Sequence, residues 1–148
     1  MAMVVEELLP AVGEILGAEL PCAELPCAVL GWSMGSYGSL LFAVAYPTTF
    51  AAVAAASPAL WQRAEDAREG AFDTDEDFRT HDVFAMRDAV ASSTVRVDRG
   101  TDGGFLGAAK AFAQGLRSKN LGGFAEGFHD DACWCSIARA QLATRLRS

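Results

Sequence analysis

Basic residues are scarce in this sequence of 148 residues. Lysine and arginine number 12 against 19 aspartates and glutamates, which gives a formal net charge of −7 and a pI near 4.7. The basic residues form no cluster, whereas a surface that binds nucleic acid needs a basic face to meet the phosphates. The composition therefore argues against a nucleic-acid partner.

The sequence also lacks the patterns of a signal peptide and of a membrane span. Its start, Met1 to Glu7, is acidic and has no basic n-region. The longest apolar stretch, residues 40–60, is interrupted by Pro47, Pro58 and several hydroxyl side chains, which is typical of a protein core. We therefore predict a cytoplasmic protein with no membrane partner.

Cysteines are few, and their spacing does not match a zinc site. Four are present, and in a chain without an export signal they are expected to be free thiols that pack as small apolar residues (Cys22, Cys27, Cys133, Cys135). No other pattern indicates a metal or a cofactor. With 51% hydrophobic and 21% charged residues, the chain is expected to fold as a single domain over 1–148.

One motif stands out against these absences, Gly-x-Ser-x-Gly at Gly31–Gly35. An apolar run at 27–30 precedes it, and a second apolar run begins at Leu40. The order strand, Gly-x-Ser-x-Gly, helix is the context of a nucleophile elbow, in which a strained serine is lifted clear of the sheet. Small residues at both glycine positions let the turn close, and the backbone N–H of Met34 is expected to face a developing oxyanion. The alternative is an ordinary glycine-rich turn.

The rest of the chain alternates between helical and strand patterns, which predicts an α/β fold with a parallel sheet of about three to four strands flanked by helices. Expected helices lie at 4–16, 34–46, 82–91, 105–116 and 131–146. Pro10 lies within the first of them, so that helix is either kinked there or has its first turn there. Expected strands lie at 27–30, 50–56 and 95–98, with a short one within 120–127. Residues 62–80 are polar and acidic, a solvated surface segment or a cap over the site.

Several segments together resemble the esterase family that includes S-formylglutathione hydrolase (esterase D) and the mycobacterial mycolyltransferases. The likeness covers nearly the whole chain, with its main segments at 31–40, 46–53, 57–61, 95–102 and 127–130. It implies a partial α/β-hydrolase fold and a serine esterase. Such an enzyme attacks a carboxylic ester or thioester through an acyl-serine intermediate, without a cofactor.

Two departures from the family pattern matter. The family's triad acid stands three residues after the glycine of a Gly-x-x-Asp-x-Phe loop; counted from Gly100 this position is Gly103, with Asp102 one residue before it. The family's first strands, and the loop that supplies a second oxyanion N–H, precede the position of Glu6. The chain therefore resembles the C-terminal portion of a longer esterase, and its strand at 27–30 is expected to be an exposed edge open to self-association.

The catalytic base has two candidates, because only two histidines are present. His129 stands in a glycine-flanked loop before the last helix, where the resemblance places the family's histidine, and we expect it to activate Ser33. The alternative for His129 is a surface loop histidine. His81 is followed by Asp82 and is expected to cap a helix or to lie on the surface.

The acid that orients His129 is the weakest element of the predicted triad. Asp102 is the leading candidate; Asp98 is more consistent with a strand end, and Asp130 with a side chain directed away from the imidazole. Loss of this orienting group alone lowers kcat by about 10⁴-fold in a serine protease. The chain is therefore expected to be either an esterase or a catalytically impaired remnant that serves as an interaction module.

The tryptophans next to the predicted strand ends are candidate pocket residues. Trp32 and Trp61 could line an acyl pocket, although aromatic side chains beside an elbow equally serve packing. The expected small-molecule partner is an ester or a thioester.

Overall fold

The computed structural model describes residues 2–15, 17, 27–117 and 120–144. Its longer elements are β1 (Cys27–Trp32), α2 (Met34–Ala45), β2 (Phe50–Ala56), β3 (Thr94–Gly100), α4 (Leu106–Gln114) and α5 (Asp131–Leu142). Shorter ones are η1 (Met3–Leu8), α1 (Leu9–Ile15), η2 (Ala64–Asp66), α3 (Asp75–Thr80), η3 (Arg87–Val90) and β4 (Phe124–Ala125). Within these ranges none of the helices has both the length and the apolar character needed to cross a bilayer.

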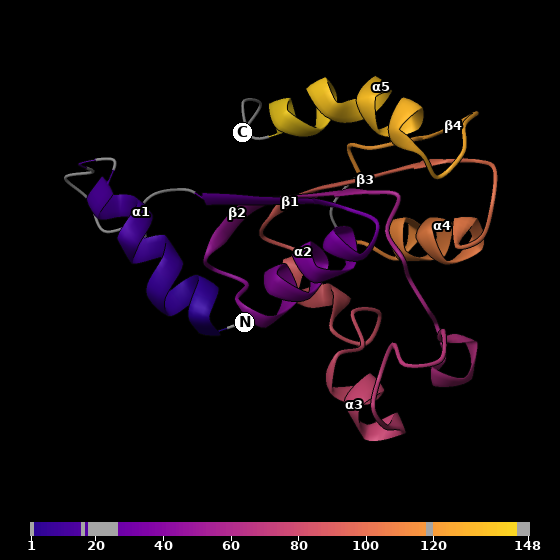
Figure 1. The fold of residues 1–148 in the computed structure, drawn as a ribbon, viewed down its shortest axis with the longest axis horizontal. Helices are drawn as coiled ribbons and strands as arrows, with labels where there is room; N and C mark the ends of the chain where they lie inside the picture. The colour runs from indigo at the N-terminus through magenta and orange to yellow at the C-terminus, as the bar shows by residue number, and fades with distance from the viewer. Residues whose placement is uncertain (1, 16, 18–26, 118–119, 145–148) are drawn as a thin grey trace.

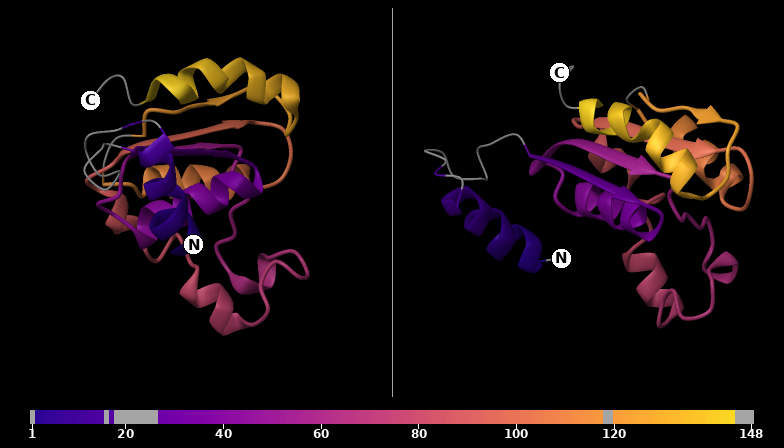
Figure 2. Two further views of the ribbon diagram at one scale, coloured as in Figure 1. Left: turned by 60° about the vertical axis from the view of Figure 1, so that its left-hand side comes forward. Right: turned by 45° about the horizontal axis from the view of Figure 1, so that its top comes forward.

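The strands form one parallel sheet in the order β1-β2-β3-β4 (Figure 1). Helix α5 covers one face, while α2 and α4 cover the other (Figures 1 and 2). The predicted parallel sheet with flanking helices is confirmed. Among the described strands, β1 pairs only with β2, so its other side is an edge of the sheet.

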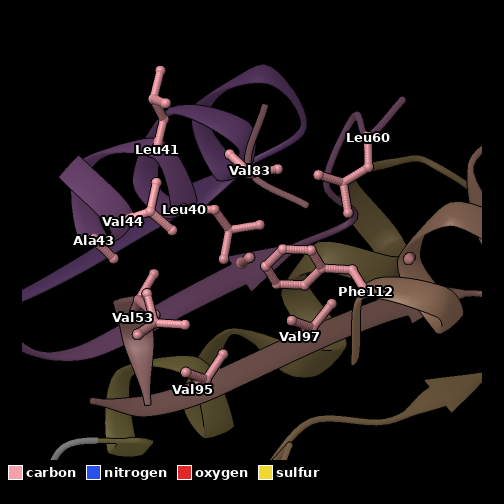
Figure 3. Packing of buried hydrophobic residues seen from close by; sticks show 13 residues of the cluster. Leu40, Leu41, Ala43, Val44, Val53, Leu60, Val83, Val95, Val97 and Phe112 are labelled. Carbon is pink, nitrogen blue, oxygen red and sulfur yellow. The ribbon is translucent and has the colours of Figure 1, made fainter. Parts of the chain in front are cut away.

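The core lies between the sheet and the helices α2 and α4 (Figure 3). Leu40 from α2 and Phe112 from α4 are fully buried against Val53, Val95 and Val97 of the central strands. Burying one large apolar side chain stabilises a fold by about 1.5–3 kcal/mol. These contacts hold β2 and β3 in place, and the loops that follow both strands lie near the candidate site.

The N-terminal segment agrees with the second of the two predictions, in which a helix has Pro10 in its first turn. It begins as the π-helical turns of η1 and continues as α1, with Pro10 in the first turn of α1. Proline has no N–H to donate and its ring crowds the preceding turn, which is consistent with the wider turns before it. The apolar stripe is not buried, because Leu8 and Ile15 are 52% and 83% exposed.

The prediction of a helix at 82–91 is wrong, since only η3 forms within this range. The side chain of Asp82 accepts hydrogen bonds from the N–H groups of Phe84 and Ala85, as at a helix N-cap, but the residues that follow form turns up to η3. The polar segment 62–80 contains η2 and α3.

Candidate active site

The Gly-x-Ser-x-Gly motif forms a sharp strand-to-helix corner between β1 and α2. Ser33 has φ 55° and ψ −118°, a backbone conformation that residues other than glycine rarely adopt. A Cβ at Gly31 would lie 2.2 Å from the carbonyl oxygen of Gly35, so only glycine fits there. At Gly35 a Cβ would meet nothing within 4 Å, so the expectation that both glycines close the turn is correct for Gly31 alone.

Hydrogen bonds tie this corner to the neighbouring strand. The N–H of Ser33 donates to Ala56 at 3.0 Å. The buried Ser36 hydroxyl lies 2.6 Å from the carbonyl oxygen of Gly31 and 2.5 Å from that of Ala56, so its single proton is shared between two strands. Ser36 was not among the predicted site residues, and no local pattern indicates it, because its two acceptors lie on different strands.

His129 lies opposite Ser33, with Nε2 2.9 Å from the serine Oγ. Its loop is held against the end of β3, because Thr101 donates to Ala125 at 2.8 Å and Asp102 donates to Gly127 at 3.0 Å, both through backbone N–H groups. The imidazole also packs edge-to-face on Trp134, with ring centroids 5.3 Å apart. The structure thus brings together a hydroxyl and an imidazole that are far apart in the sequence.

The candidate acids are not brought to the imidazole in the same way. Asp102 meets the His129 loop through its backbone, and its carboxylate forms no hydrogen bond with a described residue. Asp130 caps α5 by accepting from the N–H of Cys133 at 2.9 Å. Within the described residues, then, no carboxylate hydrogen-bonds to the second nitrogen of His129, and the role of Asp102 stays a prediction.

Asp98 forms its hydrogen bonds with residues other than His129. It is buried at the end of β3, where it receives both Nε and Nη2 of Arg96, at 2.6 and 3.0 Å. It also accepts from the N–H of Gly123 at 2.9 Å and from the side-chain amide of Gln141. These partners make Asp98 a structural carboxylate that joins β3, α5 and the segment before β4.

The electrostatic surroundings of His129 favour the neutral imidazole. Partial burial lowers its pKa below the usual 6.5, the positive charge of Arg99 lowers it further, and Asp130 acts in the opposite direction. A neutral imidazole whose Nε2 faces a hydroxyl can accept the proton of that hydroxyl.

A cavity of about 500 Å³ opens beside these two side chains. Its lining includes Ser33, His129, Met34, Trp61 and Phe105. Trp61 is buried and packs edge-to-face on Phe105, with ring centroids 5.5 Å apart. Residues 68–71 of the polar segment complete the wall, so part of that segment borders the site. Met34 is the first residue of α2, and its N–H therefore has no partner within the helix.

The other candidates lie away from this cavity. Trp32 is 39% exposed and does not contribute to the lining. His81 is the C-cap of α3, where Nδ1 lies 2.8 Å from the carbonyl oxygen of Asp77, so it ends one helix and does not open the next one as expected.

The described cysteines differ in exposure. Cys133 is half-buried and Cys135 is exposed, so the expectation of buried thiols is wrong for this pair, while Cys22 lies outside the described residues. No cluster of metal-ligating side chains occurs within the described ranges.

The parallel sheet, the strained serine at its strand-to-helix corner and the facing imidazole define an α/β fold of the α/β-hydrolase esterase type. A family model described as "Putative esterase" matches residues 3–123, and the chain belongs to this esterase family. The matched range ends before His129.

Solved structures show the same fold. A ferulic acid esterase superposes with a TM-score of 0.72 at 17% identity, over 97% of this chain and 60% of that one. S-formylglutathione hydrolases from Staphylococcus aureus and Agrobacterium tumefaciens give TM-scores of 0.65 and 0.68 at 18% and 20% identity. They are matched over 96% of this chain and over 60% and 55% of their own lengths. The chain thus spans less than two thirds of these structures. No curated protein matches the sequence.

Proposed function

We propose that this chain carries the nucleophile and the base of a serine esterase that acts on a carboxylic ester or thioester. The observation that carries the proposal is the 2.9 Å contact between Ser33 Oγ and His129 Nε2 at a strained elbow. Membership of the esterase family supports it.

The reaction proceeds in two steps. Ser33 Oγ attacks the acyl carbon while Nε2 of His129 takes the hydroxyl proton, and the N–H of Met34 donates to the developing oxyanion. The bond to the leaving oxygen or sulfur then breaks, and His129 returns the proton to that atom. Water attacks the acyl-serine by the same route, releasing the carboxylic acid and restoring the serine.

The cavity supports a substrate with an apolar acyl group. Trp61 and Phe105 form an aromatic wall next to Ser33, and Ala59 and Met34 add apolar surface. Arg68 and Glu69 bring the only charges among the lining residues other than His129. Asp102 is the proposed orienting acid, and this role requires its carboxylate to turn toward His129.

The second candidate function is a catalytically impaired interaction module. The observation that favours it is the imidazole nitrogen to which no described carboxylate is hydrogen-bonded, since an unoriented histidine is a far weaker base.

Hydrolysis of p-nitrophenyl butyrate and labelling by a fluorophosphonate separate the two candidates. The esterase is expected to release p-nitrophenol and to be labelled at Ser33, and Ser33→Ala removes both signals. Ser39→Ala is the matched control, because Ser39 lies in the same helix and donates to Gly35 within it at 2.8 Å. A folded wild-type protein with neither turnover nor label would rule out the esterase.

A further inference from the structure

Arg99, the residue before the last one of β3, is a buried cation without a counter-ion. It is 3% exposed, and its Nη2 donates to the carbonyl oxygen of Gly104. Its Nε and Nη1 are buried and have no hydrogen-bond partner. A buried charge with unused donors is costly unless an opposite charge joins it, so this guanidinium is a site that an anion would stabilise.

The neighbouring acidic groups do not fill this role. Asp98 is already bonded by Arg96, and none of the carboxylates in the described ranges forms an ion pair with Arg99. Burial lowers the pKa of Arg99, and the nearby Cys133 thiol raises it. A guanidinium presents two parallel N–H groups that match the two oxygens of a carboxylate.

A cavity of about 330 Å³ adjoins Arg99, with Gly123, Cys133 and Ser136 in its lining. Gly103 has no side chain, and the place of its Cβ lies 3.9 Å from Nη2 of Arg99. The unpaired Nε and Nη1 are closed to solvent, so an anion in the cavity reaches them only when the guanidinium turns toward it. Arg96, Asp98 and Glu126 also line the cavity. Asp98 is paired with Arg96, whereas the exposed Glu126 adds a negative charge, so a monoanion fits the cavity better than a dianion.

The charge of Arg99 also acts on the proposed base. It lowers the pKa of His129, so neutralising Arg99 would make the imidazole a stronger base. A bound carboxylate would in addition favour the imidazolium that forms when Ser33 loses its proton.

We propose that Arg99 and the adjoining cavity form a binding site for a small carboxylate anion, whose occupation activates the Ser33–His129 pair. Ester hydrolysis itself releases this chemical class. The binding site stands by itself, whereas the activation rests on the proposed esterase function.

The first test compares sodium acetate with sodium chloride at equal ionic strength and pH during p-nitrophenyl butyrate hydrolysis. Acetate is expected to raise kcat by roughly threefold to tenfold with a saturable dependence, the size of effect that one nearby charge has on an ionisable group. In the Arg99→Gln variant, the saturable increase of kcat with acetate is expected to disappear. Arg117→Gln should keep it, because Arg117 forms an exposed ion pair with Asp88 at the surface. Equal rates in acetate and chloride, in an enzyme that turns over, would overturn the activation.

A second test measures binding without catalysis. Saturation-transfer NMR of the acetate methyl group is recorded with Ser33→Ala protein, where acetate is expected to bind and an excess of formate to displace it. Absence of binding overturns the site. Acetate binding to Ser33→Ala, together with a folded wild-type protein that shows neither turnover nor fluorophosphonate label, would instead reject the esterase and keep the anion site. If Arg99→Gln does not fold, Arg99→Lys keeps the charge without the paired donors and is expected to bind acetate more weakly; unchanged affinity would contradict the proposal.

Discussion

The serine side of the Ser33–His129 contact is held by side-chain and backbone contacts, whereas the histidine side lacks a carboxylate partner among the described residues. On the serine side, Gly31 allows the close approach of strand and helix, and Ser36 links the ends of β1 and β2. On the histidine side, backbone hydrogen bonds hold the loop, yet the imidazole has no carboxylate partner among the described residues. Beside it Arg99 has no counter-ion.

This contrast shows that the position of a nucleophile and the strength of its base are separate properties of the fold. The strained elbow is maintained by hydrogen bonds and packing against the parallel sheet. The base depends on its own burial and on the charges of Arg99 in β3 and of Asp130 beside it. A protein can therefore keep the first property while the second varies.

The largest expected effect comes from removing the imidazole. His129→Ala is expected to lower kcat for p-nitrophenyl butyrate by roughly 10²–10⁴-fold, the usual contribution of general acid–base catalysis. His81→Ala is the control and should leave kcat unchanged, because His81 caps α3 away from the cavity. Similar rates for both variants would remove His129 from the mechanism.

The serine side depends on the close contact between Gly31 and the backbone of Gly35, which a substitution can test. Gly31→Ala places a Cβ against the backbone of Gly35, and we expect a loss of about 2 kcal/mol, or roughly 6 °C in Tm. Gly35→Ala meets open space and should be neutral or stabilising, because alanine favours a helix. Thermal unfolding followed by circular dichroism measures both; an equal loss in the two variants would contradict this account of the corner.

The pH dependence of kcat/KM tests the protonation state of His129. Only neutral His129 accepts a proton, and its pKa is lowered by burial and by Arg99 against the opposing effect of Asp130. Activity should therefore rise with increasing pH to a plateau, with a midpoint below 6.5. Arg99→Gln should move the midpoint upward. A wild-type midpoint above 6.5, or one that Arg99→Gln lowers, would contradict this assignment.

The smallest expected effect concerns the side of β1 opposite β2, which no other described strand joins. An unpaired edge strand promotes association, so the chain is expected to elute from size-exclusion chromatography as an oligomer or to be poorly soluble. Ala28→Lys places a charge on this edge at an exposed position and should shift the chain toward the monomer. A stable wild-type monomer with a cooperative melt would argue against association.

Local patterns predicted most of the sheet and its helices. Strand β2 forms over Phe50–Ala56 as expected, because a short, fully apolar run fits a strand buried on both faces. Helix α2 ends at Ala45, immediately before Tyr46 and Pro47, since the residue before a proline avoids the helical conformation. At 82–91 the N-cap contacts of Asp82 form without the expected helix, and in α1 the partner surface decides which residues are buried.

For the site, the sequence indicated which residues meet but not what surrounds them. The spacing of the motif and the glycine-flanked loop predicted the partners Ser33 and His129. Burial of Arg99 without a counter-ion follows from how β3, Gly103 and α5 meet in space, and no local pattern carries that information. Ser36 escaped notice for the same reason, because its two acceptors lie on different strands.

The sequential strand order has a consequence for how the protein is made. Each strand pairs with the one synthesised just before it, so the nascent chain can complete the corner around Ser33 while the rest is still on the ribosome. The imidazole emerges 96 residues later and is attached through a strand of only two residues. In the proposed mechanism, therefore, Ser33 has no base until the loop that carries His129 has been synthesised.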